Sequence, residues 1–282
     1  MAGTFRSGPI LRRGQYQFQF LDFELRAVDP VNSMQIPLEW AFGAGSQAVT
    51  FVTRVEAGWY VELAYSYYPA LPGFALTPGH AERQPKGLEE AVGLVYKAED
   101  PESGIKGCFE CHSTGPVGTR TDGALEPLQA GVQCEACHGP GSAHVAAPER
   151  IKPANPGRMS ATALNENCGR CHRPPASDPE HIDWNYAWNI RHQPVYLSQS
   201  DCFLKSNGRL SCLTCHDAHA RLETRADSYN VKCVSCHEPA RVCKTNCVDC
   251  HMPRVAPQPP LRFTNHWIGV YAPGAALRPV RR

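Results

Sequence analysis

Residues 212–219 read Cys-Leu-Thr-Cys-His-Asp-Ala-His, and the first five of them form a pattern, Cys-x-x-Cys-His, that recurs along the chain. The chain has 282 residues, with 14 cysteines and 12 histidines. At that composition, roughly 0.03 copies of the pattern are expected by chance. The copies that occur are Cys108–His112, Cys134–His138, Cys168–His172, Cys212–His216, Cys233–His237 and Cys247–His251. Six copies therefore reflect a chemical requirement.

This spacing is the one that attaches a haem covalently. The two thiols add to the two vinyl groups of one porphyrin, and the adjacent histidine is then held beneath the iron. Zinc knuckles and redox-active Cys-x-x-Cys sites do not require that histidine, and a disulfide framework does not explain it. The sequence therefore predicts six covalent haems c. The thioether bonds would come from Cys108, Cys111, Cys134, Cys137, Cys168, Cys171, Cys212, Cys215, Cys233, Cys236, Cys247 and Cys250.

The histidines divide into two groups of equal size. Those inside the motifs are predicted to be the proximal iron ligands: His112, His138, His172, His216, His237 and His251. Those outside are predicted to be the distal ligands: His80, His144, His181, His192, His219 and His266. For any one of the second group, the alternative is an exposed or hydrogen-bonded histidine.

The local context of the distal candidates differs. His219 follows His216 by three positions, so the two side chains are neighbours on a helical turn and cannot take opposite faces of one iron. We therefore expect His219, and likewise His144 after its Gly-Pro-Gly turn, to bind a neighbouring haem. The turn before His80 could aim its side chain inward, whereas the Asp-Pro-Glu-His setting of His181 also fits an exposed loop. If either one is not a ligand, one haem is open or is completed by another chain.

Two cysteines lie outside the motifs, Cys202 and Cys243. This kind of haem attachment belongs to an oxidising, extracytoplasmic compartment, which favours a disulfide between them. Two buried free thiols are the alternative. Methionine ligation is not expected, because Met252 adjoins His251 and cannot reach across the same haem.

Composition excludes several classes of protein. Lys and Arg number 28 against 27 Asp and Glu, so the net charge of +1 does not fit a strongly basic nucleic-acid binder. No run of 18 apolar residues occurs, so no transmembrane helix is predicted. With 23 glycines and 25 prolines, long helices and a broad sheet are also disfavoured.

The chain changes character near residue 80. Residues 1–79 lack cysteine and histidine and are predicted to form a small β-rich N-terminal domain, which either covers one haem or provides a docking surface. Tyr16, Phe18 and Phe20 alternate with glutamines, as in a half-buried strand. Residues 48–56 and 59–68 predict a hairpin, and residues 33–42 a third strand.

Residues 80–282 are predicted to form the hexahaem c-type cytochrome domain. It would be mostly irregular, with short helices and with the six haems as its core. Residues 88–98 and 162–169 are the clearest predicted helices, and Pro194 is expected to begin another at 195–203. Residues 1–14 lack the apolar segment of a secretory signal, so we expect a mature form, a trimmed fragment or a misplaced start.

Residues 80–268 resemble the multihaem c-type cytochromes, most closely the group that contains the tetrahaem cytochrome of nitrifying bacteria. The stretches that carry the resemblance are CEACHGPGSAH at 134–144, CFLKSNGRLSCLTCHDAH at 202–219, CVDCHMP at 247–253 and TNHWI at 264–268. The resemblance implies the six proximal histidines above, with His144 and His219 as distal ligands of neighbouring haems. It also implies a periplasmic or extracellular protein. Nitrite reductases and hydroxylamine oxidoreductases of similar architecture need a distinctive active-site haem, but the Cys-x-x-Cys-Lys of the former is missing here.

Three functions fit these observations. The first is a non-enzymatic relay, in which electrons pass through closely packed, bis-histidine haems between redox partner proteins. The second is an oxidoreductase that acts on a small nitrogen or sulfur compound at one open haem. The third is a subunit of an extracellular cytochrome filament, whose partners are other copies of the chain.

Overall fold

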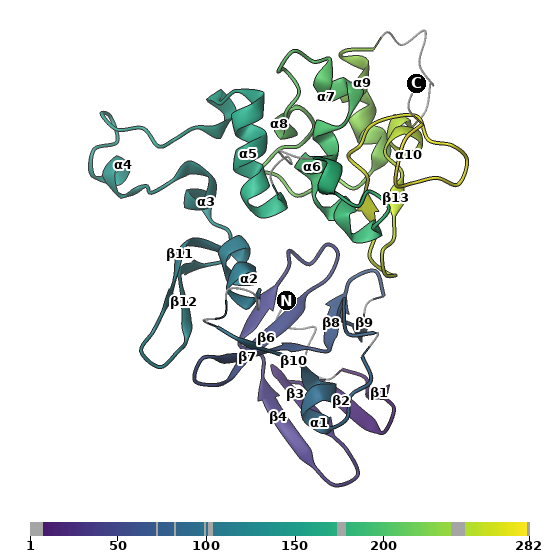
Figure 1. Ribbon diagram of the computed structural model, residues 1–282. Helices are drawn as coiled ribbons and strands as arrows, with labels where there is room; N and C mark the ends of the chain where they lie inside the picture. The colour runs from purple at the N-terminus through teal and green to yellow at the C-terminus, as the bar shows by residue number, and fades with distance from the viewer. Residues whose placement is uncertain are drawn as a thin grey trace. The chain divides into compact units, whose positions relative to one another are not determined.

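The computed structural model describes residues 8–71, 73–81, 83–98, 100, 104–173, 179–237 and 246–280 (Figure 1). Packing divides the chain into two compact units, Met1–Ala136 and Cys137–Arg282. The first unit is rich in strands and the second consists of short helices joined by loops (Figure 1). None of the described helices is long and apolar enough to cross a membrane.

The first sheet is an antiparallel meander with its strands in sequence order. Its strands are β1 (Leu11–Arg13), β2 (Tyr16–Leu21), β3 (Glu24–Val28) and β4 (Ser33–Pro37). Tyr16, Phe18 and Phe20 of β2 are buried while the residues between them are partly exposed, so the predicted half-buried strand is confirmed. Its buried face gives this unit an ordinary side-chain core.

The second sheet has the strand order β10-β7-β6-β5. Its strands are β5 (Trp40–Phe42), β6 (Thr50–Glu56), β7 (Trp59–Leu63) and β10 (Gly93–Lys97). The predicted hairpin is confirmed as β6 and β7, which turn at Ala57 and Gly58. Its second arm ends earlier than expected, because β8 (Tyr65–Tyr68) leaves to pair with β9 (Gly73–Leu76). The predicted strand at 33–42 is divided between β4 and β5, which belong to different sheets.

The helix predicted at 88–98 is wrong in its second half. Only α1 (Leu88–Val92) is helical, and the chain continues as β10 beside β7. Gly93 makes this possible, because a Cβ at this position would lie 2.1 Å from the carbonyl oxygen of Glu62. The first unit thus extends past the compositional break at residue 80, since β10 completes a sheet whose other strands precede it. The division into domains at 1–79 and 80–282 stays a prediction of composition.

A second hydrophobic core in the first unit packs against the helix of the first motif. This motif ends α2 (Ile105–His112), and the buried ring of Phe109 points into the core. The rings of Trp40, Phe42 and Tyr60 meet Phe109 edge-on, with centroids 4.9, 5.0 and 5.9 Å away. A hairpin of β11 (Ser113–Thr119) and β12 (Leu125–Ala130) follows. Aromatic packing against the second sheet therefore fixes α2 and its two thiols.

The remaining elements are short. The α-helices are α3 (Cys134–His138), α4 (Ser142–Ala146), α5 (Ala161–His172), α6 (Gln193–Ser198), α7 (Asp201–Leu204), α8 (Cys212–Cys215), α9 (Asn230–Val234) and α10 (Cys247–His251). The 3₁₀ helices are η1 (Pro156–Arg158), η2 (Pro179–His181), η3 (Ala187–Arg191) and η4 (Ala226–Tyr229), and one ribbon pairs β13 (Arg254–Val255) with β14 (Phe263–Thr264).

Two helices predicted in this part of the chain are found. α5 contains the predicted 162–169 and runs on through the third motif, and the Ser160 side chain caps it by accepting the N–H of Ala163. Pro194 lies in the first turn of α6, as expected. The predicted segment at 195–203 is nevertheless two helices, α6 and α7, because the chain breaks at Ser200.

We predict that Phe20→Ala lowers the free energy of unfolding by about 3–5 kcal/mol, because a buried ring leaves a cavity. Phe20 is 0% exposed and stacks on Phe74 at 3.9 Å between ring centroids. Phe23→Ala removes the same ring from a position that is 57% exposed and should change stability little. Denaturant unfolding of both variants tests this, and equal losses would contradict the assigned core.

Candidate functional site

Each of the six motifs has its first cysteine on a helix. They lie on α2, α3, α5, α8, α9 and α10. Residues three apart on a helix are neighbours, so both thiols face the same side in every motif but the fifth, whose Cys236 follows α9. None of the twelve motif cysteines forms a disulfide. Among the described residues, no three His, Cys, Asp or Glu side chains gather as they would around a metal ion. This donor set fits a porphyrin, which takes two sulfurs and one imidazole from each motif.

In four of the predicted ligands, a hydrogen bond to a backbone carbonyl orients the imidazole ring. The carbonyl accepts from Nδ1, which therefore carries the ring proton and leaves the Nε2 lone pair for a metal. This second contact orients the ring, as it does for metal-binding histidines in general. The bonds join His138 to Ala154 at 2.7 Å, His144 to Ile151 at 2.6 Å, His251 to Gly269 at 2.9 Å and His266 to Thr264 at 3.0 Å.

Two pairs of predicted proximal and distal ligands face each other. The rings of His138 and His219 are nearly parallel, with centroids 6.0 Å apart and planes 11° apart. The rings of His216 and His266 have centroids 6.2 Å apart and planes 37° apart. Two imidazoles on opposite sides of one metal, each at a bond length of about 2 Å, would have centroids about 6 Å apart. Both pairs are thus spaced for one iron between them.

His266 is seated by a buried polar clamp that the sequence did not reveal. The Ser200 hydroxyl donates to the carbonyl of His266 at 2.9 Å and accepts the N–H of Ile268 at 2.8 Å. The side chain of Asn265 accepts the N–H of Trp267 at 2.8 Å. Ser200 and Asn265 are both 0% exposed. Serine and asparagine are common in loops, so neither residue carries a signal in the sequence.

Burial keeps the imidazoles of His216 and His266 neutral. The pKa of His266 is lowered to about 4, chiefly by burial, with the carbonyl of Thr264 opposing this and the nearby His216 and His172 adding to it. Burial also lowers the pKa of His216. A neutral imidazole is the form that binds a metal.

His80 has a different setting. It is 1% exposed, and its Nε2 lies 3.4 Å from a carboxylate oxygen of Glu62, to which the hydroxyl of Tyr96 also donates at 3.3 Å. Burial, with Glu62 as the next cause, raises the pKa of the Cys108 thiol to about 11. This cluster therefore lies beside the first motif, but the ring nitrogen that faces Glu62 is not turned toward another imidazole.

The remaining predicted ligands are His112, His172, His181, His192 and His237. Burial, followed by Arg173 and Arg191, lowers the pKa of His192 to about 4. His112 lies against the ring of Phe42, with centroids 5.4 Å apart. The other three are exposed: His172 at the end of α5, His181 at the end of η2, and His237 after α9. Their ligation stays a prediction.

The predicted disulfide also stays a prediction, because Cys243 lies outside the described residues. Cys202 is half-buried, and burial raises the pKa of its thiol. The thiols of Cys215 and Cys236 are near enough to interact with it electrostatically. Cys202 thus lies among the cysteines of the fourth and fifth motifs.

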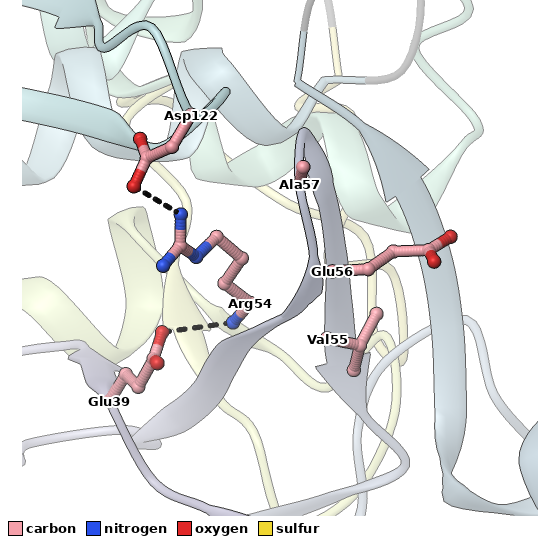
Figure 2. A pocket seen from close by; sticks show the side chains of 6 residues that line it. All are labelled: Glu39, Arg54, Val55, Glu56, Ala57 and Asp122. Atoms are coloured by element: carbon pink, nitrogen blue, oxygen red, sulfur yellow. Dashed lines mark hydrogen bonds and ion pairs between the residues drawn. The ribbon is translucent and has the colours of Figure 1, made fainter.

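A shallow pocket of about 340 Å³ opens on the first unit (Figure 2). Its lining is Glu39, Arg54, Val55, Glu56, Ala57 and Asp122. The guanidinium of Arg54 donates to Asp122 at 3.1 Å, and its backbone N–H donates to Glu39 at 2.9 Å (Figure 2). The pocket lining contains neither cysteine nor histidine, and its contacts join the β6–β7 turn to the β11–β12 turn. It is a structural contact separate from the motifs.

Comparison with known proteins finds matches among cytochromes. The family described as cytochrome c554 and c-prime matches residues 81–139, which contain the first two motifs. With its six Cys-x-x-Cys-His motifs, the chain is a multihaem c-type cytochrome, a class that binds haem c covalently and transfers electrons.

Individual relatives are more distant. The multiheme cytochrome MtrA of Shewanella baltica (strain OS185) is 26% identical over 199 residues, which are 61% of this chain and 53% of that protein. The chain thus spans about half the length of this curated relative. Among solved structures, the outer cell wall cytochrome OcwA superposes with a TM-score of 0.45 and 17% identity, over 79% of this chain and 65% of OcwA.

We predict that Ser200→Ala lowers the free energy of unfolding by about 1–3 kcal/mol, because the carbonyl of His266 and the N–H of Ile268 each lose one hydrogen bond and keep only the bond to each other. Ser198→Ala is the matched control, since the Ser198 hydroxyl bonds only to neighbours in sequence, donating to Val195 and accepting from Gln199. Its effect should be smaller. Denaturant unfolding of the two variants measures the difference, and equal effects would show that the clamp contributes nothing.

Proposed function

We propose that this protein is an electron relay of six covalent haems c, each held between two imidazoles, which works in the periplasm or outside the cell. The motif histidine would supply one axial ligand, and a histidine from elsewhere in the chain the other. An iron with both axial positions closed alternates between its ferric and ferrous states, so it carries an electron without binding a substrate.

The observation that carries this proposal is the facing of His138 with His219 and of His216 with His266. Each pair joins a motif histidine to one outside the motifs. The ring of His219 lies beside that of His138, whereas the ring of its sequence neighbour His216 lies beside that of His266. This arrangement supports the inference that closely spaced histidines serve different irons.

The attachment points also form a continuous series in the second unit. The thiols of Cys168 and Cys212 are near enough to interact electrostatically. Cys233 interacts electrostatically with Cys215 and with Cys247. The third to sixth motifs are therefore neighbours in order along the chain. Electron tunnelling falls steeply with distance, so a series of adjacent attachment points suits a relay.

Charge favours a particular kind of redox partner. An oxidised haem with two neutral imidazoles contributes about −1, from iron, porphyrin and two propionates. Six of them would take the formal +1 of the chain to roughly −5 when oxidised and about −11 when reduced. A basic surface on the partner protein is therefore favoured.

An oxidoreductase with one open haem is the second candidate. The observation that favours it is the contact between His80 and Glu62, which occupies a ring nitrogen of the distal candidate beside the first motif. A site with one axial position open could take a small nitrogen or sulfur compound. A filament subunit, with other copies as its partners, is a further alternative that electron microscopy of the native protein would reveal.

We predict that the purified protein contains six haems, all low-spin, and that His219→Ala converts one of them to the high-spin form with no loss of haem. Removing one axial imidazole leaves five ligands on one iron, which changes its spin state. A pyridine haemochrome assay counts the haems, and electron paramagnetic resonance identifies their spin states. Arg221→Ala, two residues away on an exposed segment, should leave both measurements unchanged.

Two results would decide against the relay. One is a high-spin haem in the unaltered protein that binds cyanide and is still present in the His219 variant. This result would favour the open-haem oxidoreductase. The other is a haem count below six. His80→Ala separates the cases further, because it creates a new high-spin haem only if His80 is a ligand.

A further inference from the structure

Asn165 connects the third motif to the fourth. It lies on α5 three residues before Cys168, and it is 2% exposed. Its side-chain oxygen accepts the backbone N–H of Cys212 at 3.0 Å and the thiol of the same residue at 3.1 Å. Cys212 is the first residue of α8, where a backbone N–H has no partner within its own helix. Asn165 therefore caps a helix that begins 47 residues later.

Asn230 makes the same connection between the fifth and sixth motifs. It begins α9, three residues before Cys233, and its side-chain oxygen accepts the backbone N–H of Cys247 at 3.0 Å. Cys247 is the first residue of α10. The first cysteines of the two motifs are 44 residues apart in one pair and 14 in the other. The same contact thus arises across loops of very different length, so loop length does not impose it.

The first cysteines of each connected pair lie near enough for their thiols to interact electrostatically, Cys168 with Cys212 and Cys233 with Cys247. A thioether sulfur has no proton to donate, so haem attachment would end the bond from the Cys212 thiol to Asn165. The bond from the backbone N–H to asparagine does not involve sulfur and would persist. It is therefore the contact that can keep the two sulfurs side by side in the finished protein.

The other four motifs have a different residue at the position of these two asparagines. Three residues before the first cysteine, the other four motifs have Ile105, Gly131, Arg209 and Lys244. At this position, asparagine thus occurs only before the first motif of each connected pair and not before the second.

We propose that Asn165 and Asn230 are positioning residues that join motifs three and four, and motifs five and six, into two equivalent two-haem modules. The inference rests on covalent haem attachment as set out in the proposed function. Each asparagine holds the first cysteine of one motif against that of the next, and so brings together the two porphyrin edges bonded to those sulfurs. Variation in that spacing would otherwise slow electron exchange within the pair.

The test is circular dichroism in the Soret band, where two nearby porphyrins give a paired positive and negative signal. Asn165→Ala and Asn230→Ala should each reduce this signal, and the double variant should lose the sum of the two. Loss of one such hydrogen bond should change the equilibrium constant between the connected and the separated arrangement of a motif pair by about fivefold. Asn167→Ala is the matched control, because Asn167 lies on the same helix and its backbone carbonyl accepts from Arg170, but the contact between Asn165 and Cys212 does not involve its side chain.

Haem count and spin state, measured on the same samples, separate this inference from the proposed function. Six low-spin haems with a reduced Soret signal support the modules. Six low-spin haems with the signal of Asn167→Ala overturn them, while the relay stands. High-spin haem or a low count in the unaltered protein counts against the relay itself.

A second variant covers the case in which Asn165→Ala does not mature. Asn165→Asp retains an oxygen that accepts the same N–H, so it should restore both the haem count and the Soret signal. If Asn165→Asp fails in the same way as Asn165→Ala, the side chain is needed for another reason and the assignment is wrong.

Discussion

The hydrogen bond from an imidazole Nδ1 to a backbone carbonyl is the constraint on which the candidate iron sites depend. It fixes the proton on one ring nitrogen and so directs the other toward a metal. Three of the carbonyls that accept it come from loops, at Ala154, Ile151 and Gly269, and the fourth belongs to Thr264, the last residue of the short strand β14. Irregular segments suit this protein, because most carbonyls within a helix or a sheet are already bonded to backbone N–H groups.

The two compact units are stabilised in different ways. Among the described residues, the first has two clusters of buried side chains, one of which includes Ile105 and Phe109 of α2. The described part of the second has one smaller cluster, around Ile190, Tyr196 and Trp267. Helices of four or five residues, such as α8 and α10, are too short to be stable by themselves. A haem attached covalently at each one, as proposed, would supply the apolar contact that their own side chains cannot.

Contacts between residues that are far apart in the sequence orient the thiols and imidazole of each motif. A motif places two thiols and an imidazole within five residues, but its orientation is set from elsewhere. Ser200 holds the segment of His266, which lies 66 residues away, and Asn165 caps the helix of Cys212. These polar groups are buried and bonded to backbone, so they fix geometry without taking part in ligation.

The sequence by itself determined the chemistry. The spacing of two cysteines and a histidine is local, and covalent attachment needs nothing beyond those five residues, so six motifs could be found by inspection. The alternation of Tyr16, Phe18 and Phe20 is also local and predicted its strand correctly. Only the tertiary structure decided which imidazole faces which, that Gly93 turns a predicted helix into a strand, and that Asn165 and Asn230 join motifs in pairs. The reason is physical: these outcomes depend on contacts that close loops of 14 to more than 80 residues, and no pattern of neighbouring residues records which loop ends will meet.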